Sequence, residues 1–212
     1  MDAASIAQRC AEVDLPDGGH LVIRPVRPDD KERMAEAFSR MSPRTRYRRF
    51  FAPINALSEP FLSELTEVDY VDRFAWVALA CEGDHAALVG VARYARLADP
   101  AAAECALVVV DEYQGRGIGS LLLDALILEA IEAGISRFEG EVLADNGAMR
   151  GVLRENGAHF SVGGERGASH FAFDLPSRAE ALRGHPMHDV LRRLAKGEVS
   201  LYEAEPCPWA GA

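Results

Sequence analysis

The stretch Val108-Val109-Val110-Asp111-Glu112-Tyr113-Gln114-Gly115-Arg116-Gly117-Ile118-Gly119-Ser120-Leu121-Leu122 joins an apolar strand to a leucine-rich helix through a turn with three glycines. Glycine can adopt positive φ and lets a ligand approach the backbone closely, so Gly115, Gly117 and Gly119 leave this turn free to fold around a ligand. The first amides of the following helix have no intrahelical partner and lie at the positive end of the helix dipole. The stretch therefore predicts an anion site that suits a diphosphate.

Two other glycine turns do not match this spacing. A dinucleotide-binding turn has the pattern Gly-x-Gly-x-x-Gly with an acid about 20 residues later, and a P-loop ends in Gly-Lys-Ser/Thr. The turn here has no lysine and a tighter glycine spacing. At Gln114, Gly117 and Gly119 it resembles the Arg/Gln-x-x-Gly-x-Gly/Ala pyrophosphate loop of the GNAT superfamily of acyl-CoA-dependent N-acetyltransferases. A helix start after a tight turn, without a ligand, is the alternative.

Other segments extend the resemblance over roughly residues 20–175. A strand at 137–143 follows the helix, and residues 146–157 read as a short helix with Asn146 at its start and Gly157 as its cap. GNAT proteins carry Asn at that helix start, beside the coenzyme. The chain is most similar to the bacterial protein lysine acetyltransferases, some of which act on acetyl-CoA synthetase and some of which carry a fused cyclic-nucleotide-binding domain. The segments that carry this likeness are residues 39–51, 65–70 and 89–94 and the glycine loop.

Length and composition suit one catalytic domain. The chain has 212 residues, and 49% hydrophobic residues are enough for a sizeable core. We expect an N-terminal extension at 1–19, the acetyltransferase domain at 20–175 and a helical tail at 176–212, and no room for a cyclic-nucleotide module before the domain. Four cysteines without C-x-x-C spacing, no leader and no run of 18 apolar residues predict a cytoplasmic protein without a membrane span. The net charge of −10 argues against nucleic acid as a partner.

The pattern of elements predicts a mixed α/β sheet. We expect a strand at 104–110 whose residues 105–110 are apolar on both faces, which is typical of a central strand covered on both sides. The helix after it returns the chain to a parallel strand. The remaining strands form hairpins, so most of the sheet is antiparallel. The resemblance implies the GNAT fold, in which this parallel pair splays apart between flanking helices. The other elements that we expect are a strand at 20–26, helices at 28–41 and from 58 onwards, and hairpins at 74–81 with 86–97 and at 158–162 with 169–174.

The resemblance also implies the coenzyme and the residues that hold it. Acetyl-CoA would lie in the splayed cleft, with its pantetheine against strand backbone and its pyrophosphate in the glycine loop. We predict no metal, because His185-x-x-His188 has no partnering acid or cysteine cluster. The predicted coenzyme-binding residues are Leu107, Val108, Val109, Gln114, Gly115, Arg116, Gly117, Ile118, Gly119, Ser120, Asn146 and Arg150.

Transfer to an amine requires a base, because a lysine-like amine with a pKa of about 10.4 is almost fully protonated at neutral pH. Glu104, at the start of the central strand, resembles the GNAT glutamate that deprotonates the amine directly or through water; the alternative is an acid that merely begins a strand. Cys105 points to the opposite sheet face in a regular strand, so we expect direct transfer in a ternary complex. Leu153 stands where many GNAT enzymes have a tyrosine acid, which leaves the general acid open.

Two charged clusters leave the acceptor open. The basic cluster, within residues 40–49, could bind the coenzyme 3′-phosphate or an acidic partner, or could be a salt-bridged connection between helices. The acidic cluster, within residues 59–72, could receive a lysine-bearing surface, or could be a solvated helix face. We expect an acetyltransferase acting on protein lysines, such as those of acetyl-CoA synthetase. A small-amine acetyltransferase and a non-catalytic CoA-binding domain are the alternatives, and the oligomeric state is not predicted. The clusters are Arg40, Arg44, Arg46, Arg48 and Arg49, and Glu59, Glu64, Glu67, Asp69 and Asp72.

Overall fold

The computed structural model describes residues 6–82, 85–162 and 167–176. The predicted tail and its His185-x-x-His188 lie outside these residues. The strands are β1 (Ala11–Asp14), β2 (His20–Pro25), β3 (Arg73–Glu82), β4 (His85–Arg96), β5 (Ala102–Val109), β6 (Arg137–Leu143), β7 (His159–Val162) and β8 (Ala168–Asp174). The helices are η1 (Pro28–Asp30), α2 (Lys31–Arg40), α3 (Pro43–Phe50), α4 (Glu59–Thr66), η2 (Asp111–Tyr113), α5 (Ile118–Glu132) and α6 (Gly147–Glu155).

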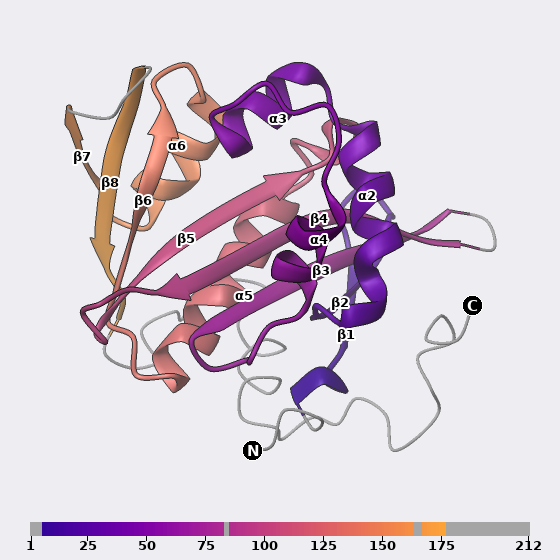
Figure 1. The fold of residues 1–212 in the computed structure, drawn as a ribbon, viewed down its shortest axis with the longest axis horizontal. Coiled ribbons are helices and arrows are strands. Elements are labelled where there is room, and N and C mark those ends of the chain that lie inside the picture. Colours follow the sequence, from indigo (N-terminus) through magenta and orange to yellow (C-terminus); the bar gives the residue numbers. More distant parts are fainter. Residues whose placement is uncertain (1–5, 83–84, 163–166, 177–212) are drawn as a thin grey trace.

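All of these strands belong to one sheet, in the order β1-β2-β3-β4-β5-β6-β8-β7 (Figure 1). Every neighbouring pair is antiparallel except β5 and β6, which are parallel. The parallel ladder begins with Ala102 opposite Arg137 and ends with Glu104 opposite Glu139. Beyond that point each strand continues without the other, so the predicted splay and the predicted GNAT fold are confirmed.

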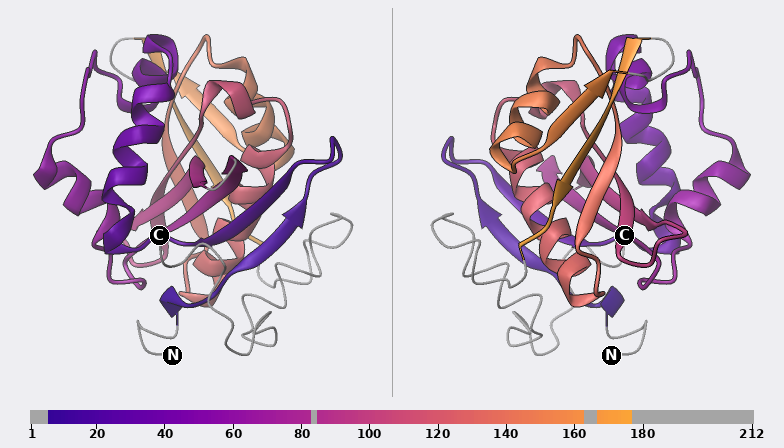
Figure 2. Two further views of the ribbon diagram at one scale, coloured as in Figure 1. Left: turned by 90° about the vertical axis from the view of Figure 1, so that its right-hand side faces the viewer. Right: turned by 90° about the vertical axis from the view of Figure 1, so that its left-hand side faces the viewer.

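Helices cover the sheet on both faces, with α5 on one side and α2 on the other (Figure 2). Under α5 lies an aromatic core that includes Trp76 and Phe138, both almost fully buried. The indole of Trp76 donates a hydrogen bond to the Ala125 carbonyl of α5 (3.2 Å). On the other face Val77 and Val91 pack under α2 and α4. The double apolar face of the central strands follows from these two layers, because each successive side chain enters one core or the other.

The predicted strands and helices are present with small differences at their ends, but β1 and α3 were not predicted. Strand β1 has only four residues, and the turn before β2 contains Gly18 at φ +85°, a hairpin signal that could have revealed it. Helix α3 carries four arginines in eight residues, which hides its apolar side. Its start was readable, since Ser42 caps the helix by accepting a hydrogen bond from the Thr45 amide and Pro43 follows it.

No helix in the described part of the chain is long and apolar enough to cross a membrane.

Candidate active site

The glycine loop opens α5 without a side-chain cap. Gly115 and Gly117 adopt φ of +75° and +85°, a region that side chains disfavour, and Gly117 is the N-cap residue of α5. No side chain caps this end of the helix. The amides of Ile118, Gly119 and Ser120 therefore lie in a first helical turn that offers them no intrahelical acceptor. The loop has the geometry that the sequence predicted for an anion site.

Beyond Glu104, strand β5 presents one backbone edge to the splayed cleft. The amide of Val110 donates to the Val89 carbonyl of β4 (2.9 Å). Because backbone groups alternate along an antiparallel strand, Val108 also turns its amide and carbonyl toward β4, whereas Leu107 and Val109 turn theirs toward the cleft. The cleft edge of β5 is thus formed by Leu107 and Val109, and Val108 contributes its side chain only.

A cavity of about 300 Å³ occupies this cleft. Its walls come from α3, from the end of β5, from the glycine loop with the first turn of α5, and from α6. Every predicted coenzyme-binding residue lines it except Arg116 and Arg150. The lining residues are Thr45, Arg48 and Arg49; Leu107, Val108 and Val109; Tyr113, Gln114, Gly115, Gly117, Ile118, Gly119 and Ser120; and Asn146, Ala148, Met149 and Val152.

Helix α3 is held over the cavity by Asp111, the residue after Val110. The Asp111 carboxylate accepts hydrogen bonds from the Ser42 amide (2.8 Å), the Ser42 hydroxyl (2.7 Å) and the Thr45 hydroxyl (2.8 Å). Burial alone would raise the pKa of Asp111, but these hydrogen bonds outweigh it and hold the pKa below its ordinary value. Gln114 ties the loop to the same place, because its side-chain amide donates to the Val109 carbonyl (2.9 Å).

Replacing Asp111 with Asn should loosen α3 and lower the free energy of unfolding by about 1 to 3 kcal/mol, since Ser42 and Thr45 lose a charged acceptor. The folded pKa lies below the ordinary 3.8, so this stabilisation is complete above pH 3.8 and disappears as the pH falls through the folded pKa. Urea unfolding from pH 6 to pH 3 measures both effects, and the variant should lose less stability in acid than the unmodified protein. Glu112→Gln is the control, because the exposed Glu112 makes only a surface ion pair with Arg40 (2.8 Å) and should change stability by about 0.5 kcal/mol or less. Equal stabilities of the Asp111 variant and the control would contradict the anchoring role.

Arg116 and Arg150, which do not line the cavity, have partners elsewhere in the chain. The guanidinium of Arg116 forms two hydrogen bonds with the carboxylate of Asp17 in the turn between β1 and β2, at 2.5 and 3.0 Å. This pair lowers the pKa of Asp17 to about 2. Arg150 stacks on Phe160, with its guanidinium carbon 4.2 Å from the ring centroid. Asn146 does line the cavity, and it also caps α6 by accepting a hydrogen bond from the Met149 amide (3.3 Å).

Glu104 lies on β5 with an exposed side chain and does not line the 300 Å³ cavity. Its strand neighbours are Ala95 on β4 and Glu139 on β6. Cys105 is buried on the opposite face, as predicted, and burial raises the pKa of its thiol, which disfavours a thiolate nucleophile. Leu153 is fully buried in the core, so that position offers no proton donor.

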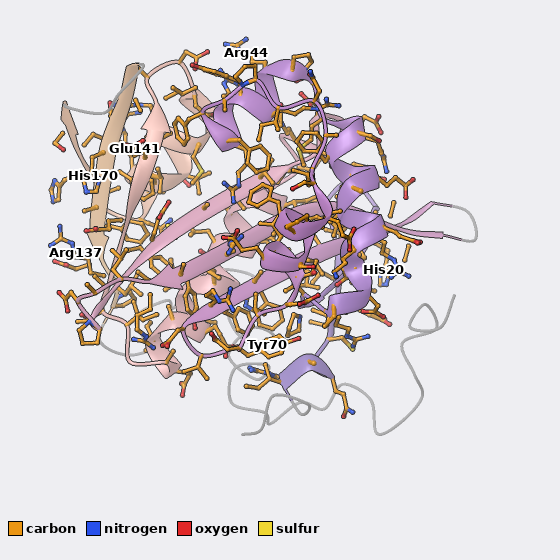
Figure 3. The ribbon with its side chains drawn as sticks, in the orientation of Figure 1. His20, Arg44, Tyr70, Arg137, Glu141 and His170 are labelled. Carbon is orange, nitrogen blue, oxygen red and sulfur yellow. The ribbon has the colours of Figure 1, made fainter. Side chains whose placement is uncertain are left out.

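Most of the basic cluster is occupied by contacts within the chain. Arg44 and Arg48 both pair with Asp145 in the loop between β6 and α6 (2.9 and 3.2 Å), and Arg44 is labelled on α3 in Figure 3. Arg46 donates to the carbonyls of residues 38 and 39 at the end of α2. The salt-bridged alternative therefore holds for this part of the cluster. Arg48 and Arg49 differ in that they also line the cavity.

The acidic cluster is also largely satisfied internally. Lys31 pairs with Glu67 (2.7 Å) and Glu59 (3.4 Å), and Asp72 pairs with Arg96 (2.7 Å). Burial alone would raise the pKa of Asp69, but hydrogen bonds from the amides of residues 73, 71 and 72 lower it. These acids hold helices and turns in place, which leaves few of them for an acceptor. In the described ranges no group of three or more His, Cys, Asp or Glu side chains is arranged to hold a metal ion.

The comparison with solved structures identifies the same architecture. The GNAT domain of S. lividans PAT superposes with a TM-score of 0.72 and 34% identity, covering 82% of this chain and 99% of that domain. The model of the acetyltransferase (GNAT) family matches residues 35–158, more than half of the chain. This chain therefore belongs to the GNAT family of N-acetyltransferases.

Two relatives are named acetyltransferases. An acetyltransferase of Pseudomonas aeruginosa is 38% identical over 136 residues, which cover 64% of this chain and 73% of that protein. Acetyltransferase Pat of Mycolicibacterium smegmatis is 42% identical over 147 residues, 69% of this chain. The matched region is only 43% of the length of Pat, so this chain spans less than half of that relative.

Proposed function

We propose that this protein transfers the acetyl group of acetyl-CoA directly to lysine ε-amines of other proteins, in a ternary complex, with Glu104 as the general base. One observation carries the proposal. The glycine loop, the free edge of β5 and Glu104 follow one another along a single strand and turn. This is the order in which acyl transfer from a coenzyme needs an anion site, a thioester site and a base.

The residues around the cavity fit the coenzyme. The uncapped start of α5, with Gly115 and Gly117 at positive φ, suits the pyrophosphate. The cleft-facing backbone of Leu107 and Val109 suits the pantetheine amides, and an amide at this edge would donate a hydrogen bond to the thioester oxygen. The carbonyl of Val109 already accepts from Gln114, which leaves its amide for this purpose.

The reaction balances without a further reactant. Glu104 removes one proton from the lysine ammonium, directly or through water, and the neutral amine forms a bond to the thioester carbon. The carbon–sulfur bond then breaks and the attacking nitrogen loses its second proton to water, while the CoA thiolate takes up one proton from water. The products are N-acetyl-lysine and CoA, and Glu104 returns its proton to solvent. A thiolate is a fair leaving group near neutral pH, so the reaction does not require an acid at Leu153.

Two features favour a protein acceptor. Glu104 is exposed, and the same sheet face continues over β6 and β8, where Glu141 and His170 lie opposite each other (Figure 3). A lysine on a protein surface could reach Glu104 across this face. The segments that resemble the protein lysine acetyltransferases include α3, which borders the cavity.

Incubation with acetyl-CoA, a folded protein such as acetyl-CoA synthetase and a panel of small amines tests the proposal. We expect mass spectrometry to find acetyl-lysine on the protein and a rate on small amines at least about tenfold lower. Acetylation confined to small amines would show that the acceptor is a small amine rather than a protein lysine. CoA binding without transfer to any acceptor would favour the non-catalytic alternative.

A further inference from the structure

A second, smaller cavity lies on the α2 side of the sheet. Its volume is about 30 Å³, and α2, α3, α4, the loop before α4 and strands β4 and β5 contribute to its walls. The lining is apolar apart from two arginines and includes Phe38, Leu57 and Val91. No carboxylate lines it. A space of this size and character suits one or two carbon atoms rather than a polar group.

The two cavities share a wall. Arg49 and Val108 line both of them. Val108 stands between Leu107 and Val109, the two residues whose backbone faces the splayed cleft. If the thioester lies at that backbone edge, as the proposed function requires, its acyl carbon comes next to Val108 and therefore next to the smaller cavity. The Arg49 side chain lines both spaces and so borders the passage from the thioester to the small cavity.

Arg49 has an unusual environment for a cation. Burial lowers the pKa of its guanidinium to about 10, with repulsion from Arg93 adding to the effect and attraction to Glu104 opposing it. Within the described residues, no carboxylate lies at ion-pair distance from Arg49. Its guanidinium carbon instead lies 5.0 Å from the centroid of the Phe50 ring. Truncating a buried cation is usually costly because it leaves a buried carboxylate without its partner. Truncating Arg49 should not have this cost, because no carboxylate pairs with it.

We infer that the smaller cavity receives the end of the acyl chain and that Arg49 limits the length of the chain that fits. The space allows about one methylene beyond an acetyl group, so acetyl-CoA and propionyl-CoA should both bind well. Butyryl-CoA and hexanoyl-CoA should meet the Arg49 side chain. This inference rests on the proposed function for the position of the thioester, but it concerns binding and can be tested without an acceptor.

Calorimetric titration with CoA, acetyl-CoA, propionyl-CoA, butyryl-CoA and hexanoyl-CoA tests the inference. In the unmodified protein propionyl-CoA should bind within about threefold of acetyl-CoA and butyryl-CoA at least about tenfold more weakly, a usual penalty for one methylene too many. Arg49→Ala should widen the passage between the two cavities and bring butyryl-CoA within about threefold of acetyl-CoA. Arg44→Ala is the matched control from the same helix, because the exposed Arg44 pairs with Asp145 and lines neither cavity, and it should keep the original order of affinities.

A second variant tests the far wall. Leu57→Phe should fill the small cavity and weaken propionyl-CoA by about tenfold relative to acetyl-CoA, while the affinity for CoA itself stays the same. Unchanged affinity ratios in Arg49→Ala and Leu57→Phe, with CoA still bound, would overturn the acyl pocket. Chain-length discrimination that responds to both variants in a protein that transfers no acyl group would support the pocket and refute the proposed function.

Discussion

Replacing Glu104 with Gln should lower turnover about 10²- to 10⁴-fold near neutral pH and leave CoA affinity nearly unaltered. Glutamine keeps the shape and the exposure of the side chain but cannot accept the ammonium proton. The effect should therefore fall on the chemical step, because Glu104 does not line the cavity that fits the coenzyme. Activity of the variant should partly recover as the pH rises toward the amine pKa of about 10.4, where free amine accumulates without a base.

The neighbouring strand supplies a matched control. Glu139 stands opposite Glu104 in the parallel ladder and projects from the same sheet face. Glu139→Gln removes the same charge one strand away, so a loss caused by the general field of this face would appear in both variants. Initial rates with saturating acetyl-CoA and a protein acceptor, from pH 6 to pH 10, separate the two cases. Equal losses of turnover in the two variants, or normal turnover in Glu104→Gln, would show that Glu104 is not the general base.

The sequence was sufficient to predict the parts of the site that local pattern controls. Alternation along β5 places Glu104 and Cys105 on opposite faces, and the glycine spacing places positive φ at Gly115 and Gly117. These features depend on a few consecutive residues, so no distant contact can change them easily. The strand at 137–143 was predicted with its observed ends for the same reason.

The parts that were missed depend on contacts between distant residues. Arg116 stays a predicted coenzyme residue from its place in the loop. What the sequence missed is its ion pair with Asp17, 99 residues away in a hairpin that the sequence analysis did not predict. Helix α3 was missed because its arginines conceal the side that covers the cleft, and its anchor Asp111 is 69 residues from Ser42. The sequence therefore did not show that α3 forms one wall of the cavity.

Gly117→Val should weaken CoA binding more than tenfold, or by more than about 1.4 kcal/mol. Gly117 has φ of +85°, where a branched side chain is strained, and a left-handed residue costs about 1 to 2 kcal/mol without any ligand contact. A Cβ at this position would meet no protein atom within 4 Å. The protein itself therefore has room for the added atoms, and the loss of affinity must come from the shifted loop or from the space that the diphosphate needs.

Gly134→Val separates the site effect from the strain. Gly134 also has a positive φ, +77°, and open space around it, but it lies beyond the far end of α5 from the glycine loop. Both variants should lose stability by a similar amount in thermal unfolding, and only Gly117→Val should lose affinity in a calorimetric titration with CoA. A folded Gly117→Val protein with unchanged affinity would show that the diphosphate does not bind at the start of α5. An equal loss of CoA affinity in Gly134→Val would instead attribute the effect to strain in α5. A diphosphate site formed by the glycine loop has no physical reason to respond to a change at the other end of that helix.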